Sequence, residues 1–525
     1  MPSSTPPPTS VNIQVDRTER RWILAALMMT MMLAAMDTTI VSTAIPQIVG
    51  DLGGFALFSW VFSIYLLAQT VTIPIYGKLA DVFGRKPILI VGTVIFLAGS
   101  VASAFSWNML SLIAFRGLQG LGAGSIMATV YTLAGDLYSV RERAHIEGWL
   151  SSVWGISAIV GPTLGGVFVE YASWRWIFFI NLPVGAVALA LMARFLHEQP
   201  RHKRHEIDYA GAGAMLVAGS ALIFALLQGG QAWPWFSAPS ATSFGIALLL
   251  IGAAIRAERR AAEPVMPRWL WRHRVITGAN LSMVGMGLVM MGPNTYLPTF
   301  GQSVLGLGPI AAGLMLASMS IGWPLASSWS GRLYLRFGFR DTALGGAVLV
   351  VLAAAGFLFR PFPDSAWPIM IDQVLLGAGF GLLSTPILVG VQNTVTYRDR
   401  GVVTGANIFS RYLGQSLGAA LFGAVFNNAM RSELAHAPEA LRAGLPTDIN
   451  AVISALQGSA LHSQEVQQTA DRYLRQAIAT ATEHVYAGMA VVALITVGIV
   501  LLTPRKFPDA SEGSSAGEPE TGGHA

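Results

Sequence analysis

The sequence predicts an all-α polytopic membrane protein, and three observations lead to this fold class. Of the 525 residues, 53% are hydrophobic and only 12% are charged, about half the charged fraction of an ordinary soluble domain. Apolar runs near the length that crosses a bilayer follow one another along most of the chain. Basic residues gather in alternate connections between these runs. Because backbone groups in lipid must bond internally, each run is predicted to be a helix.

Fourteen transmembrane helices are predicted from these runs. Their approximate spans are 22–46, 57–76, 88–106, 109–133, 148–169, 176–196, 209–229, 240–257, 276–298, 309–330, 342–360, 367–391, 403–427 and 482–503. The first run is too long for a signal peptide and holds a charge, so we expect it to be retained. The segments 1–21 and 504–525 are predicted to be disordered cytoplasmic tails.

The distribution of basic residues predicts the orientation. With the N-terminus inside, most of the 33 Lys and Arg residues fall in cytoplasmic connections, whereas the short outer loops hold only Arg175 and Arg360. We therefore expect a multi-pass protein of the cell (inner or plasma) membrane with both termini in the cytoplasm. The outer loop 428–481 is too small for an enzyme domain, and its stretch 449–480 is predicted to be an amphipathic helix capping the outer face.

Composition excludes several classes of function. The chain has no cysteine, which rules out a disulfide scaffold, a thiolate metal site and a cysteine nucleophile. No phosphate-binding G-x-x-x-x-G-K-[ST] loop is present, so ATP is not the expected energy source. The net charge of +5 is scattered in short clusters, which argues against nucleic-acid binding. We expect no cofactor, no metal site and no enzymatic activity.

The two halves of the chain carry the same pattern. Gly77-Lys-Leu-Ala-Asp-Val-Phe-Gly-Arg-Lys86 reappears as Gly331-Arg-Leu-Tyr-Leu-Arg-Phe-Gly-Phe-Arg340. Repeats of like orientation are typical of rocker-type secondary transporters, whose substrate site lies between the halves. The predicted organisation is a six-helix bundle at 22–196, a linker with helices seven and eight at 197–275, and a second six-helix bundle at 276–503.

Several segments resemble signatures of the major facilitator superfamily. Segment 77–87 is similar to its loop signature between the second and third helices, Arg116-Gly-Leu-Gln-Gly120 to its fourth-helix motif, and Gly161-Pro-Thr-Leu-Gly-Gly166 to the fifth-helix motif of its antiporters. Segments 37–46 and 174–185 resemble signatures of its fourteen-helix drug:proton antiporter branch.

This resemblance covers residues from about 20 to 503. It implies a major facilitator fold with two six-helix bundles and two inserted central helices. The second half departs from the motifs, since Leu335 replaces the acidic loop residue and Gln373 takes the place of Arg116. Functional residues are therefore assigned to the first half only.

Asp37 is the deepest acidic residue of the predicted spans. Helical rise places it about 13 Å below the outer face, and Arg116 in the fourth helix about 11 Å below the same face. Because a lone charge in a bilayer is costly, we expect the two to be neighbours lining a central cavity. Two interpretations remain open: a proton-coupling pair, in which Asp37 loads and releases a proton, or a fixed structural ion pair.

Other polar residues of the spans are less specific. Gln119 lies one turn after Arg116 and is predicted to line the substrate cavity together with Met36, although Gln119 can equally bind a neighbouring helix. Arg411 lies roughly 12 Å from the inner face, where its side chain can snorkel to water.

The loop after the second helix has a predicted conformational role. Gly77 permits close helix approach, Gly84 allows a tight turn, and Arg85 and Lys86 hold the loop at the anionic inner leaflet. Asp81 can face the positive N-terminal end of a helix in the other half. The resemblance implies that this is the thirteenth helix and that the loop is a latch. The alternative is that the basic residues only set topology.

The fifth-helix motif comprises Gly161, Pro162, Gly165 and Gly166. Proline kinks a helix, and small residues let another helix pack closely. Packing alone can explain this motif, and the resemblance adds a barrier to leak.

The resemblance implies a proton-coupled antiporter that exports amphipathic or cationic organic compounds by alternating access, as in multidrug resistance. The expected partners are a small-molecule substrate, protons and the lipid bilayer, and an accessory envelope protein is left open. Two alternatives remain: a dedicated exporter of one metabolite or lipid-like compound, and a non-transporting membrane receptor or scaffold.

Overall fold

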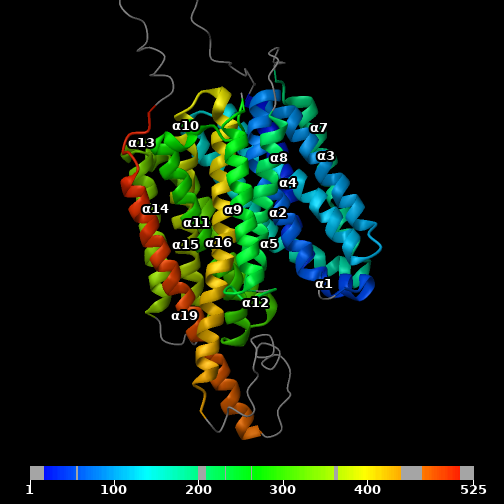
Figure 1. Cartoon of the computed structure of the whole chain (residues 1–525), viewed down its shortest axis with the longest axis vertical. Coiled ribbons are helices and arrows are strands. Elements are labelled where there is room, and N and C mark those ends of the chain that lie inside the picture. The colour runs from blue at the N-terminus through cyan, green and yellow to red at the C-terminus, as the bar shows by residue number, and fades with distance from the viewer. Residues whose placement is uncertain are drawn as a thin grey trace, which may run out of the picture.

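A computed structural model describes residues 17–54, 57–198, 208–230, 232–261, 263–359, 365–438 and 464–508. Within these ranges the regular structure is helical, apart from one isolated bridge between Gly229 and Trp233. The long helices run roughly along one axis, and both described chain ends lie at the top of Figure 1. We call this end the termini end and the opposite one the far end.

Seven helices form the first bundle. They are α1 (Arg17–Leu52), α2 (Phe58–Phe83), α3 (Arg85–Ala104), α4 (Met109–Leu137), α5 (Val140–Tyr171), α6 (Trp176–Phe179) and α7 (Asn181–Phe195). Helix α4 packs against α2 and α3, while α5 and α7 pack against α1. Two clusters of buried apolar side chains fill this bundle, and nearly all of their members come from these helices.

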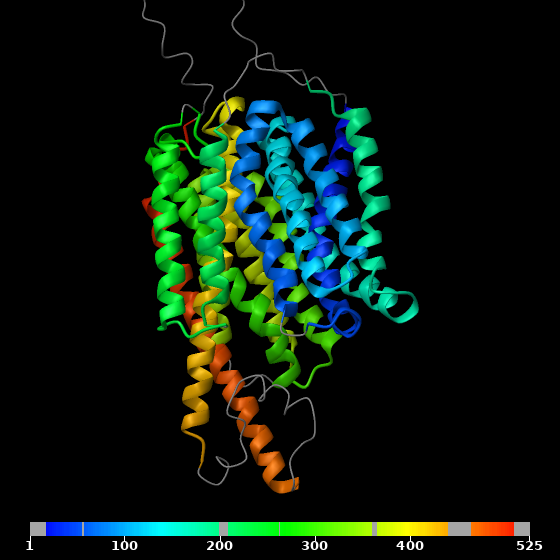
Figure 2. The same cartoon turned by 45° about the vertical axis from the view of Figure 1, so that its right-hand side comes forward.

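The inserted segment contains α8 (Tyr209–Gln228), α9 (Ala238–Glu258) and the short α10 (Arg268–Arg272). Helices α8 and α9 pair with each other, and α8 also packs against α2 and α16. Figure 2 shows this green pair standing at the side of the molecule, along both bundles. Many of its apolar side chains are exposed, such as Leu248 and Leu249, which is the pattern of helices that face lipid.

The second bundle follows. Its helices are α11 (Arg274–Ser303), α12 (Pro309–Ala317), α13 (Met319–Phe337), α14 (Phe339–Leu358), α15 (Trp367–Asn393), η2 (Tyr397–Asp399), α16 (Arg400–Ala435) and α19 (Gln464–Leu502). A single large apolar core holds them together, and it is drawn from this part of the chain together with Leu270 of α10. The two bundles meet where α2 packs against α16 and where α5 packs against α13.

By length and hydropathy, twelve helical segments of the described chain qualify as membrane spans. The two predicted spans outside this set correspond to α4 and α16, which are long enough to cross but contain no stretch of sufficient hydropathy to qualify. Both pack against several other helices in the middle of the molecule, so little of their surface needs to be apolar. The molecule is an all-helical, multi-pass membrane protein, and the count of fourteen spans stays a prediction.

Several predicted boundaries are wrong. Helix α1 begins at Arg17, so part of the segment 1–21 is helical, while residues 1–16 and 509–525 lie outside the described ranges. The predicted capping helix at 449–480 is not a separate element. Its residues from Gln464 onward belong to α19, and its earlier part lies outside the described residues. Helices α16 and α19 both extend beyond the other helices at the far end (Figure 1), since helical bonding continues past the apolar stretch.

The sequence repeat has a structural counterpart in two tight turns. Gly84 separates α2 from α3 with φ of 102°, and Gly338 separates α13 from α14 with φ of 92°. Positive φ values of this size are readily adopted only by glycine. The repeated glycines therefore build the same helix–turn–helix connection in both bundles.

Candidate functional site

The structure brings Asp37, Arg116 and Gln119 together inside the first bundle. Arg116 Nη1 donates to Asp37 Oδ2 at 2.5 Å, and Gln119 Nε2 donates to Asp37 Oδ1 at 2.8 Å. Arg116 Nη1 also bonds Gln119 Oε1 at 2.8 Å, while the guanidinium lies 4.3 Å from the centre of the Tyr65 ring. Both carboxylate oxygens therefore have a donor, and the cation has two kinds of partner.

This acid–arginine cluster is closed to solvent in the present conformation. The side chains of Asp37 and Arg116 are 0% and 1% exposed, and Met36 and Gln119 are also buried. The two bundles enclose a cavity where they meet, and none of these four residues lines it. The cluster therefore belongs to the interior of the first bundle, and contact with water requires a change of conformation.

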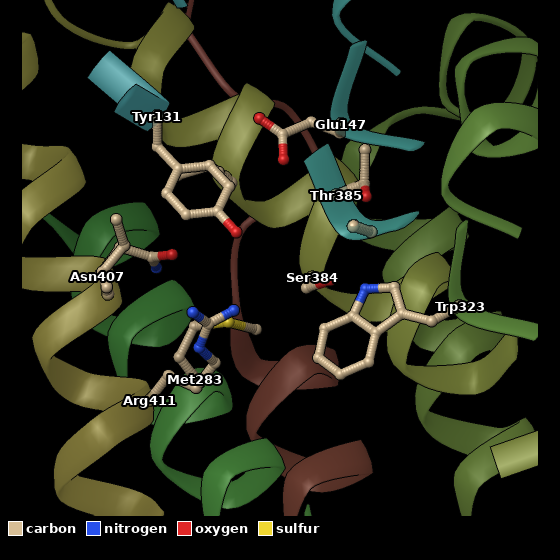
Figure 3. Close-up of a pocket in the computed structure, with 11 residues that line it drawn as sticks. Tyr131, Glu147, Met283, Trp323, Ser384, Thr385, Asn407 and Arg411 are labelled. Carbon is tan, nitrogen blue, oxygen red and sulfur yellow. The ribbon is translucent and has the colours of Figure 1, made fainter. Parts of the chain in front are cut away.

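A small polar cavity lies where the two bundles meet. Its lining comes from α4 and α5 of the first bundle and from α11, α13, α15 and α16 of the second. The cavity measures about 30 Å³, room for about two water molecules. Figure 3 shows polar side chains from both bundles around this space, among them Tyr131, Glu147, Asn407 and Arg411.

Glu147 is the functional candidate that sequence analysis missed. The predicted fifth span began at 148, which placed Glu147 in a cytoplasmic connection. Helix α5 instead begins at Val140, so Glu147 lies about 10 Å into the helix and its residue is only 6% exposed. The capping box of Ser139 and Glu142 marks this earlier start and was the available signal.

Arg411 also points into this cavity, rather than toward the end of the bundle. It contacts the hydroxyl groups of Tyr131 and Tyr412, and its Nε atom has no partner. Tyr412 in turn accepts a hydrogen bond from Gln69 Nε2 at 3.2 Å. Gln69 lies one turn after Tyr65 on α2, so polar side chains connect the acid–arginine cluster to the cavity.

At the termini end, Asp81 caps a helix of the other bundle. Its two carboxylate oxygens accept hydrogen bonds from the backbone N–H groups of Gly401 and Val402, at 2.9 and 2.8 Å. These are orphan donors in the first turn of α16, which has no side-chain cap of its own from Asp399. Asp81 thus does across the bundle interface what an N-cap residue does locally, at the helix that the resemblance implied.

The predicted contact of Arg85 with the inner leaflet is wrong, whereas its place in the latch stays a prediction. Its side chain is 0% exposed and does not reach a lipid surface. It forms ion pairs with Asp81 at 2.6 Å and Asp136 at 2.9 Å, and it donates to the Tyr397 carbonyl. Asp136 also pairs with Arg400 at 2.6 Å. Three neighbouring carboxylate and carbonyl groups attract the guanidinium more strongly than a screened surface charge could.

The remaining loop residues shape the same contact. A Cβ atom on Gly77 would lie 2.5 Å from the carbonyl oxygen of Gly401, so only glycine permits this close crossing of α2 and α16. Lys86 is half-buried and donates to the Ala193 carbonyl, and Glu198 accepts from the Lys86 backbone N–H.

The repeat is asymmetric in this contact. On the other side of the interface, Gly331 lies against Ala144 of α5 and Tyr334 donates to the Val140 carbonyl. The residue in the position of Asp81 is Leu335, which is exposed. The first turn of α5 is already capped by Ser139 and Glu142, so no acid from the other bundle is needed there.

The glycines of the fifth helix differ in their surroundings. Cβ atoms on Gly161 and Gly165 would collide with Thr39 and Thr43 of α1, whereas one on Gly166 would meet nothing within 4 Å. Gly161 and Gly165 therefore serve the packing of α5 on α1. Pro162 lies inside this continuous helix.

No group of three or more His, Asp or Glu side chains in the described ranges is placed to hold a metal ion. The site instead consists of two buried groups of charges and an interface between two repeated bundles. One group is Asp37 with Arg116, and the other is Arg85 with Asp81 and Asp136. These features define the class of membrane transport proteins built from two bundles around a central site.

Comparisons with known proteins agree with this class. The profile of the Major Facilitator Superfamily matches residues 27–419, and the chain belongs to this family. It is 34% identical to the multidrug transporter protein MdtP of Bacillus subtilis, over 78% of this chain and 76% of that protein. It is 32% identical to the efflux pump FUS6 of Gibberella moniliformis, over 81% and 77% of the two chains.

Solved structures show the same fold. The human organic anion transporter MFSD10 aligns with a TM-score of 0.63 and 13% identity, over 91% of this chain and 99% of that one. The proton:xylose symporter XylE aligns with a TM-score of 0.59 and 12% identity, over 96% and 100%. Membership of this family, together with the relatives in it, identifies the protein as a transporter of small molecules and not an enzyme.

Proposed function

We propose that this protein is a proton-coupled antiporter that exports amphipathic or cationic organic compounds from the cytoplasm. Its relatives support export, because their names describe a multidrug transporter, a multidrug resistance protein and an efflux pump. One proton moving inward across about 150 mV supplies roughly 3.5 kcal/mol, enough to sustain a gradient of several hundredfold for a cargo without net charge. Exchange of one proton for a monovalent cation moves no net charge, so the pH gradient alone drives the export of such a cation.

The buried pair of Asp37 and Arg116 carries the proposal of proton coupling. Burying two charges in a membrane protein is costly and contributes little to stability compared with apolar packing. This cost is explained if the Asp37 carboxylate binds and releases a proton during the transport cycle. When Asp37 binds a proton, its attraction to Arg116 weakens and the cluster can rearrange.

Glu147 and Arg411 extend this proposal toward the other face. Asp37 lies about 30 Å along α1 from the termini end, whereas Glu147 lies about 10 Å from that end along α5. Polar side chains of Gln69, Tyr412 and Arg411 lie between the two acids. We therefore assign Asp37 to the outer half and Glu147 to the inner half of a proton route.

Alternating access is assigned to the contacts at the termini end, which basic-residue placement puts in the cytoplasm. Asp81, Arg85 and Asp136 join the two bundles there. These contacts close the inner side, and they must break when the inner side opens. Drug-sized ligands need a pocket of about 300–1,000 Å³, and the small cavity between the bundles is far below this size. We therefore interpret it as the closed form of a cargo site.

Reconstitution into vesicles with an imposed pH gradient tests this function. A panel of organic cations, zwitterions and neutral compounds is added, and substrate-evoked proton movement is recorded with a trapped pH dye. Response to many compounds is the expected result. A response to one compound would replace multidrug export by a dedicated exporter, and silence across the panel would favour a receptor or scaffold.

Glu147→Gln is expected to raise the apparent KM for monovalent cationic cargo at least tenfold, with less effect on the KM for neutral cargo, while the maximal rate of proton-driven transport falls for both because Glu147 is part of the proposed proton route. The reason is that Arg411 then faces the cavity without a nearby carboxylate, and unit charges a few ångströms apart interact by several kcal/mol at an effective dielectric of about 20. Initial transport rates in the same vesicles measure this. Glu142→Gln is the matched control, because Glu142 is on the same helix but exposed. Equal KM values for both variants would remove Glu147 from the cargo site.

A further inference from the structure

A second, much larger cavity lies outside the central site. It has a volume of about 740 Å³ and lies between α8, α9, the segment that ends in α10, and α16. Its wall is mainly apolar, with Met215, Leu222, Ile251, Phe409 and Leu413 among the lining residues. Helix α16 separates the two cavities, since Arg411 lines the central one while Phe409 and Leu413 line this one.

This lateral cavity opens on the surface of the molecule. Ile255 and Trp271, which both line it, are each 48% exposed. The exposed side chains of α8 and α9 are those of membrane helices, so the opening faces lipid and not a protein interior. In an apolar recess that opens to a bilayer, contact with lipid acyl chains is favoured over contact with water.

The rim of the cavity nearest the termini end is positively charged. Arg259, Arg268 and Arg272 line it, and all three residues are exposed. The one acidic lining residue, Glu258, accepts hydrogen bonds from the backbone N–H groups of Val265 and Met266. Its charge is therefore partly used to hold the connecting segment, and the three guanidinium groups dominate the rim.

We propose that this cavity binds one anionic phospholipid of the inner leaflet. The acyl chains occupy the apolar recess between α9 and α16, and the phosphate of the headgroup bonds the arginines of the rim. Basic pockets between membrane helices on the cytoplasmic side bind lipid headgroups in this way, and guanidinium groups suit phosphate oxygens. The rim charge disfavours the rival occupant, a cationic cargo molecule.

The bound lipid supports the rear face of α16. This helix carries Gly401 and Val402, which bond Asp81, and Arg411 in the central cavity. Of the α8–α9 pair, α8 packs closely against α16, and it also packs against α2. A lipid between α9 and α16 fills the remaining space and joins the inserted pair to the second bundle.

Native mass spectrometry of the delipidated, full-length protein tests the proposal, with phosphatidylglycerol and phosphatidylcholine as probes. We expect tighter binding of phosphatidylglycerol to the wild type. Arg268→Ala with Arg272→Ala should weaken it about 25-fold, because each basic residue near such a surface contributes roughly fivefold. Arg332→Ala with Arg336→Ala is the matched control. These two exposed arginines lie near the last turn of α13 and are outside the cavity.

A second variant tests the apolar part of the lateral cavity. Leu222→Trp fills the recess and should reduce the occupancy of both lipids, whereas the arginine variant acts on phosphatidylglycerol alone. Equal phosphatidylglycerol affinity in the arginine variant and its control would overturn the proposal. So would displacement of the lipid by a transported organic cation, because the cavity would then be a cargo site.

Discussion

Asp37→Asn is expected to reduce proton-driven transport to the level of empty vesicles. The amide has nearly the same shape as the carboxylate and still accepts one hydrogen bond from Arg116, but it cannot carry a proton through the cycle. Proton movement evoked by cargo, recorded with a trapped pH dye, measures the effect. Cargo exchange without a gradient is expected to persist, because it does not need the proton.

The structure also supplies a control for stability. The single substitution leaves Arg116 buried without a counter-charge, and breaking a buried ion pair in this way costs about 3–5 kcal/mol. The double variant Asp37→Asn with Arg116→Gln removes both charges and should recover the melting temperature in detergent. If the pair were only structural, the double variant would recover transport as well. Recovery of proton-driven transport there would therefore exclude Asp37 as the proton carrier.

Gly77→Val is expected to prevent closure of the termini end and to stop transport. The added side chain begins 2.5 Å from the Gly401 carbonyl oxygen, so α2 and α16 must separate and the bonds from Gly401 and Val402 to Asp81 must lengthen. Overpacking of this kind costs typically 1–3 kcal/mol, which shifts the ratio of closed to open molecules about 5- to 150-fold.

Spin-label distances measure this shift directly. The chain has no cysteine, so single cysteines can be introduced at Phe83 and Arg398, which are exposed at the termini end on opposite bundles. Gly345→Val is the control, because a Cβ atom there meets nothing within 4 Å. A distance distribution that matches the control, together with full transport, would show that the close crossing is unnecessary.

The fold class could be predicted from properties that each segment of the sequence carries by itself. Low charge and long apolar runs specify membrane helices, and a helical segment lies at each of the predicted spans. The repeated Gly84 and Gly338 specify the same turn twice. The contact between Asp37 and Arg116 could be predicted from their similar depth in the membrane, because buried charges at the same depth are costly unless they pair.

Other features depend on contacts between distant segments. Arg85 was predicted at the lipid surface, and only the fold reveals that Asp136 and the Tyr397 carbonyl surround it. The acid–arginine cluster is sealed within one bundle, whereas the cavity between the bundles belongs to Glu147 and Arg411.

The sequence by itself determined that this protein is a two-bundle membrane transporter with a buried acid near mid-span, because each of those properties is carried by one helix or by a repeat. The tertiary structure decided which charges meet. It joined Asp81 to the uncapped start of α16, brought Glu147 and Arg411 to one cavity, and left a basic-rimmed recess beside the inserted helices. Six helices contribute to that central cavity, and the packing angles that join them are not encoded in any one segment.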